Sequence, residues 1–183
     1  MRFPIVAATI LLLAACGGSS GSNDANNAPD ANNSSDANNT PACTFTLSGA
    51  LTASGRCDNL FVVWDMGKNQ ASFSLTLDAS AYANATLTYP GDWHTGSWTE
   101  TTSGVDGAIT AMQSQSATQS WQALADGSST PQGSWTLNLT DLGQSTSGSS
   151  GKVYSGMHGT LNATLAPTAI SGATGNVTLA VTF

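Results

Sequence analysis

The sequence has few charged side chains, and positively charged ones are the scarcest. Its 183 residues include four Lys and Arg against eleven Asp and Glu, a formal net charge of −7 at pH 7. Proteins bind nucleic acid through basic side chains that neutralise phosphates, so this balance argues against a nucleic-acid partner. It also argues against electrostatic attraction of the folded part to anionic lipid.

Long apolar runs are missing as well. The apolar stretch Ile5–Leu13 is shorter than the roughly 20 residues that a transmembrane helix needs. Arg2 precedes this stretch, and the small residues Ala14 and Ala15 follow it. This order is typical of a secretory signal peptide that is removed after export.

The end of the leader carries a more specific motif. Leu13-Ala14-Ala15-Cys16 resembles the lipobox of bacterial lipoprotein signal peptides. The resemblance implies that residues 1–15 are cleaved and that Cys16 is acylated, with palmitate-type chains that anchor the protein durably in a membrane. Gly17 stands where Asp tends to retain lipoproteins in the inner membrane, so the resemblance favours the outer membrane, on its periplasmic face or at the cell surface. The alternative is an ordinary secretory signal with a chance cysteine.

Cysteine is scarce, with three in the chain. If Cys16 carries lipid, Cys43 and Cys57 remain as an even pair in an oxidising compartment. We expect them to form one disulfide at the open end of a hairpin, the alternative being two free thiols. Two cysteines do not make a zinc site, and we expect no metal and no cofactor.

Residues 17–41 contain no aromatic and no large aliphatic side chain. Together with the lipidated Cys16 they predict a disordered spacer, since such a composition cannot bury a core. A six-residue repeat starts at Asp24, Asp30 and Asp36, but it lacks the alternating ligands, central Gly and distal Glu of a calcium-binding loop. Residues 42–183 then have the length of one domain.

This domain alternates apolar and polar residues with the period of a β-strand. Alternation predicts strands within the segments 43–47, 72–77, 135–140, 157–165 and 177–183. We expect an all-β fold, an antiparallel β-sandwich of about eight to ten strands, with a small closed β-barrel as the alternative because both bury alternate residues.

Two segments depart from strict alternation. Leu60–Trp64 is continuously apolar, which predicts a central strand covered on both faces. Ala108–Leu124 fits a helical stripe in part, but its Ser, Thr and Gln content favours two strands.

Groups for catalysis are few. His94 and His158 are the only histidines, and Asp92 lies two residues before His94. A metal or acid–base site needs three or four converging groups, and nothing in the sequence brings these together. We therefore assign no catalytic residue and no metal ligand.

Tryptophan is the one residue type that suggests a ligand. Trp93 and Trp98 flank Gly96 in a loop-rich segment, and tryptophans in loops can stack on sugar rings. The alternative is that they fill the core, as we expect of Trp64 and Trp135.

Three functions remain. We expect a lipid-anchored envelope protein that displays a non-catalytic β domain for a structural or protein-interaction role. The alternatives are a carbohydrate- or small-ligand-binding lipoprotein and, third, an enzyme. The membrane is contacted through the lipid on Cys16, and the other partner is a protein or a glycan.

Overall fold

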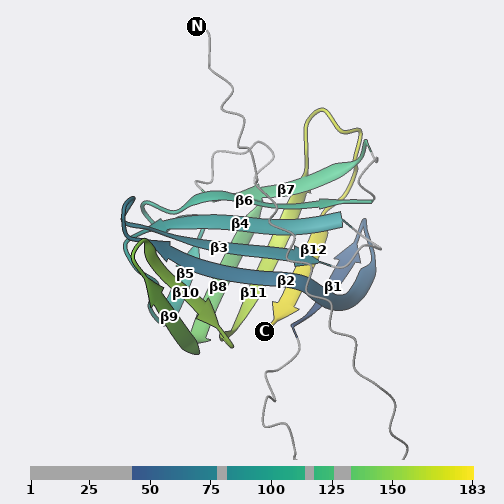
Figure 1. Ribbon diagram of the computed structural model, residues 1–183. Coiled ribbons are helices and arrows are strands. Elements are labelled where there is room, and N and C mark those ends of the chain that lie inside the picture. The colour runs from purple at the N-terminus through teal and green to yellow at the C-terminus, as the bar shows by residue number, and fades with distance from the viewer. Residues whose placement is uncertain (1–42, 78–81, 114–117, 126–132) are drawn as a thin grey trace, which may run out of the picture. The chain divides into compact units, whose positions relative to one another are not determined.

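The computed structural model describes residues 43–77, 82–113, 118–125 and 133–183. These residues contain twelve strands and no helix (Figure 1). None of their segments is a helix long and apolar enough to cross a membrane. The strands are β1 Thr44–Gly49, β2 Ala53–Asp65, β3 Gln70–Leu77, β4 Tyr82–Pro90, β5 Gly96–Thr99, β6 Asp106–Met112, β7 Ser120–Leu124, β8 Ser134–Asp141, β9 Gln144–Gly148, β10 Gly151–Ser155, β11 His158–Pro167 and β12 Val177–Thr182.

Eight of these strands close into a barrel, in the order β1-β12-β11-β7-β6-β4-β3-β2, and β2 pairs back onto β1. Every pairing is antiparallel. Figure 1 shows β7, β6, β4, β3 and β2 as one wall, with β8, β11 and β12 crossing behind it. The all-β prediction is confirmed, and of the two expected architectures the closed barrel is the one found.

The two longest strands carry the extra ones. β2 has 13 residues and pairs with β1 through Ala53–Arg56 and with β10 through Val62–Asp65. β11 has 10 residues and pairs with β8 and then, at its end, with β7. The added pairs β10–β9 and β8–β5 therefore extend the two walls beyond the closed ring.

The interior is filled by the inward half of each alternating strand. In β12 the buried residues are Val177, Leu179 and Val181, and in β8 they are Trp135, Leu137 and Leu139. Each fully buried aliphatic or aromatic side chain contributes about 1.5–3 kcal/mol. The alternation in the sequence thus marks the core face correctly.

Ala108–Leu124 forms two strands, β6 and β7, as the sequence predicts. Ile109 and Trp121 point inward, and each has a buried alanine two residues further on. The buried residues therefore recur at every second position, as in a strand, and not at helical intervals of three or four.

The expectation for Leu60–Trp64 is half wrong. The segment lies in β2, and Val62 is fully buried, but Phe61 is 45% exposed. Part of β2 therefore keeps an apolar face open to solvent.

Candidate functional site

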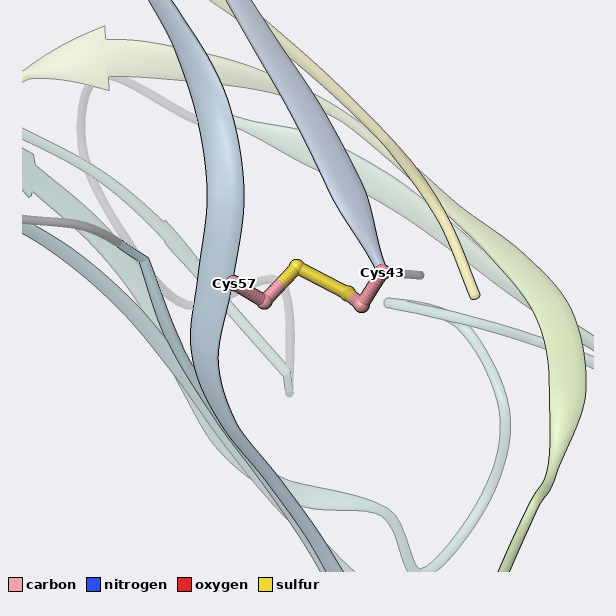
Figure 2. The surroundings of a disulfide bond; sticks show 2 residues. All are labelled: Cys43 and Cys57. Atoms are coloured by element: carbon pink, nitrogen blue, oxygen red, sulfur yellow. A yellow bond between two sulfur atoms is a disulfide. The ribbon is translucent and has the colours of Figure 1, made fainter. Parts of the chain in front are cut away.

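Cys43 and Cys57 form the predicted disulfide (Figure 2). Cys43 directly precedes β1, Cys57 lies in β2, and their Cα atoms are 5.3 Å apart. The backbone N–H of Cys57 also donates to the carbonyl of Cys43 at 3.0 Å. The bond therefore closes the open end of the β1–β2 hairpin, next to the segment predicted as a spacer.

Cys16, the leader 1–15 and the spacer residues 17–41 lie outside the described residues. Lipidation of Cys16 and the division of the chain into leader, spacer and domain stay predictions.

Asp92 is the centre of a charged hydrogen-bond network in the described barrel. It lies in the loop between β4 and β5, and both of its carboxylate oxygens are used. Oδ2 accepts from Lys152 Nζ at 2.5 Å, and Oδ1 accepts from the Tyr154 hydroxyl at 2.5 Å and from the Trp93 N–H at 2.9 Å. Lys152 Nζ also lies 5.1 Å from the centre of the Trp64 ring. The network fastens the β4–β5 loop to β10.

These contacts shift two pKa values. Partial burial raises the pKa of Asp92, but the hydrogen bonds from Lys152 and Tyr154 and the positive charge of Lys152 outweigh it, so the net pKa is lowered. Burial, and then the hydrogen bond to the Asp92 carboxylate, raise the pKa of Tyr154. At neutral pH Asp92 is an ionised, fully engaged carboxylate, which makes it a poor general acid.

The network predicts an acid-dependent loss of stability. A carboxyl group whose pKa is lower in the folded than in the unfolded state stabilises the fold above its unfolded value of 3.8, and this contribution disappears as pH falls through the folded value. Thermal unfolding followed from pH 7 to pH 2 should show a steeper loss in the wild type than in Asp92→Asn below about pH 4. Asp58→Asn, at an exposed position of β2, is the matched control and should follow the wild type. Parallel curves for the wild type and Asp92→Asn would contradict this assignment.

The two histidines do not join Asp92. His94 packs against the edges of Tyr89 and Trp98, with ring centres 5.9 and 5.1 Å apart. His158 begins β11, where its carbonyl accepts from the Thr140 hydroxyl at 3.1 Å. Within residues 43–183, gaps aside, no three His, Cys, Asp or Glu side chains gather as metal ligands.

Trp93 and Trp98 lie in the core, 4% and 3% exposed. Their rings meet edge to face at 5.3 Å, and Tyr89 stacks on Trp93 at 5.9 Å. Burial removes the open ring face that a sugar would need, so in this conformation neither residue forms the expected platform. Sugar stacking on these rings stays a prediction that requires their covering side chains to move.

The end of β2 (Phe61–Asp65), the following Met66, and strands β10 and β9 form an apolar arm, in which β10 and β9 extend beyond the closed ring. Among the described large apolar side chains, four are exposed, and the arm holds three of them: Phe61 at 45%, Met66 at 52% and Val153 at 46%. Val153 pairs with Val63, which places both on the outer face. Such clustered exposure is typical of an interaction surface.

The arm also carries a groove and an open edge. Val63, Trp64, Lys152 and Gly151 are among the residues that line a groove of about 350 Å³. Gly151 is required here because a Cβ would collide with the Trp64 carbonyl oxygen. β9 pairs only with β10 among the described strands. Its sequence Gln-Ser-Thr-Ser-Gly has no charge and no proline, two of the features that block pairing at a sheet edge.

Sequence reasoning singled out Asp92 but missed Lys152 and Tyr154. These lie 60 and 62 residues away from it in sequence. The one available signal was that Lys152 and Tyr154 share a strand face. Their meeting with Asp92 depends on how β10 docks, which no local pattern encodes.

Comparisons of the chain with family models, with curated proteins and with solved structures find no match.

Proposed function

We propose that this chain is a bacterial envelope lipoprotein that displays a non-catalytic β-barrel for interaction with a protein partner. Lipid on Cys16 holds it at the membrane, most favourably the outer one, and residues 17–41 form the spacer. Without Arg2, three cations stand against eleven acids, a formal charge of about −8. The lipid is therefore the membrane contact, and nucleic acid is not a partner.

The disulfide is the observation that carries this proposal. Structural disulfides form and persist in oxidising compartments, which include the bacterial periplasm and the cell surface. Cys43–Cys57 supports export, as the lipobox-like leader also does. It lies where load from a membrane anchor would enter the barrel, since Cys43 is the first described residue after the spacer.

We propose a non-catalytic barrel because the polar side chains of its main charged network are already bonded to one another. Asp92 is neutralised by Lys152 and bonded by Tyr154, so each member of the network already has a partner. A catalytic acid, base or nucleophile needs a group that is free to exchange protons with a substrate.

The arm is the surface where we place the protein partner. An extended, uncharged segment of that partner would pair with the open edge of β9. The adjoining part of the partner would lie over Val153 on β10 and Phe61 on β2, the next two strands of the sheet. Strand addition of this kind takes its affinity from backbone hydrogen bonds and its specificity from alternate side chains.

Crosslinking in living cells tests the arm. A photoreactive residue at position 153 should give one discrete adduct with a protein identified by mass spectrometry. The same residue at position 86, on the exposed face of β4, is the control and should not give it. Thr146→Lys, which adds a charge to β9 opposite Val153, should remove the adduct. An adduct that persists with Thr146→Lys, or the same pattern from position 86, contradicts the proposed surface.

A further inference from the structure

A second surface, independent of the arm and of the anchor, lies on the outside of the wall that contains β8, β11 and β12. Three cross-strand rows run over β1, β12, β11, β8 and β5 and comprise fourteen outward positions. Eight are Thr, three Ser, two Asn and one Ala, and none is charged or large and apolar. They are Thr44, Thr46, Ser48, Ser97, Thr99, Ser134, Thr136, Asn138, Thr160, Asn162, Thr164, Thr178, Ala180 and Thr182.

A groove of about 370 Å³ lies on this face. Two cross-strand rows of three residues contribute to its lining: Thr99, Thr136 and Asn162 in one, and Ser134, Thr164 and Thr178 in the other. Side chains on neighbouring strands are about 4.8 Å apart and those two residues apart on one strand about 6.7 Å. The groove therefore presents hydroxyl and amide groups at regular intervals.

The turn after β5 forms one side of the groove and is held firmly. Glu100 accepts the backbone N–H of Trp135 at 3.0 Å, and the Thr102 hydroxyl accepts the N–H of Thr99 at 2.8 Å. Within the described part of the chain, the side chains of Thr136, Asn162, Thr164 and Thr178 make no hydrogen bond to another residue. Their donors and acceptors are available to a ligand.

The charge of the groove limits the ligand class. Glu100 is the only charged residue among those that line it, and it is negative. Phosphorylated, sulfated and acidic ligands would be repelled. Apolar peptides and lipids would find no exposed apolar side chain to cover, since Ala163 and Trp135 are buried.

We propose that this groove binds a neutral glycan chain. A sugar hydroxyl both donates and accepts, as Thr and Ser hydroxyls do, and the Asn162 amide offers one donor group and one acceptor to adjacent hydroxyls. Because these bonds replace bonds to water and no aromatic ring is exposed in the groove, the affinity is in the millimolar range.

The test uses the full chain with Cys16→Ser, so that failure of the anchoring proposal does not affect the result. Its backbone amide signals are followed by NMR while cellohexaose, maltohexaose, xylohexaose, mannohexaose and chitohexaose are added in turn at millimolar concentration. At least one should shift the signals of Thr136, Asn162 and Thr164. Polygalacturonate, an anionic chain, should leave them unchanged.

Substitutions that remove hydroxyls but keep shape locate the site. Thr136→Val with Thr164→Val should weaken binding about tenfold, the loss of two hydrogen bonds. Thr76→Val with Thr86→Val, on the outer face of the opposite wall, is the matched control and should bind as before. The proposal is overturned if no neutral hexasaccharide shifts the groove signals, if polygalacturonate binds there, or if both double variants lose binding equally.

Discussion

Replacing both Cys43 and Cys57 by alanine is expected to lower the free energy of unfolding by about 3 kcal/mol. The bond closes a loop of 14 residues in sequence, and a loop of this length removes about that much chain entropy from the unfolded state. For a domain of this size the thermal midpoint should fall by about 10 °C. Calorimetry at neutral pH measures both quantities, and the reduced wild type should match the double variant.

The same variant should also unfold at a lower pulling force when it is held by residue 42. β1 is paired on one side with β2 and on the other with β12. Without the bond, force at residue 42 would load the hydrogen bonds at the start of β1 one after another. With the bond, force passes to β2 at Cys57, and from this residue to Asp65 β2 is paired with β3.

Single-molecule pulling separates these two effects. Equal unfolding forces for the wild type and the double variant would leave the thermodynamic effect in place and remove the mechanical one. Unchanged midpoint and unchanged force together would mean that the bond adds nothing to the fold.

Cys16→Ser is expected to release the protein from membranes. Each methylene of an acyl chain buried in lipid contributes about 0.8 kcal/mol, so several chains hold the wild type in the membrane pellet and in the detergent phase. The variant should move to the aqueous phase and should not incorporate an alkyne analogue of palmitate. We expect the folded part to add no electrostatic attraction to anionic lipid, because only three cations lie among its described residues: Arg56, Lys68 and Lys152.

Cys43→Ala with Cys57→Ala is the matched control, since it removes cysteines and leaves the lipobox-like motif intact. It should be labelled and pelleted as the wild type is. If Cys16→Ser takes up the label, or stays in the detergent phase, Cys16 is not the attachment point.

Local patterns predicted the local parts of the fold. Alternation identified the inward residues, such as Leu137 and Leu179, because a strand buries every second side chain whatever its partner. The disulfide could also be predicted from the sequence, since Cys43 and Cys57 belong to one hairpin and no distant strand is needed to bring them together.

The features that depend on pairing between strands far apart in the sequence could not be predicted. Sandwich and barrel differ by whether β1 meets β2 and β11 meets β7, and both bury the same residues. Phe61 is exposed because it points to the outer face of β2, opposite the buried Val62. A continuous apolar sequence does not show whether one face or both faces of the strand are buried.

The candidate sites also combine residues that the local sequence identified with contacts that depend on long-range strand pairing. Asp92 was considered only as a neighbour of His94, and its actual partners lie on β10. Trp93 and Trp98 looked like loop residues. Trp93 does lie in the β4–β5 loop, but Trp98 lies in β5, and both are buried and pack against Tyr89. The glycan groove depends on the register of β5, β8, β11 and β12, which no single segment specifies.

The mass of the mature N-terminal peptide tests lipid-anchored display most directly. Protein extracted from bacterial membranes and digested with a protease should yield a first peptide that begins at Cys16 and carries a diacylglycerol on its sulfur and an acyl chain on its amine. A first peptide that begins elsewhere, or an unmodified Cys16, would contradict the account.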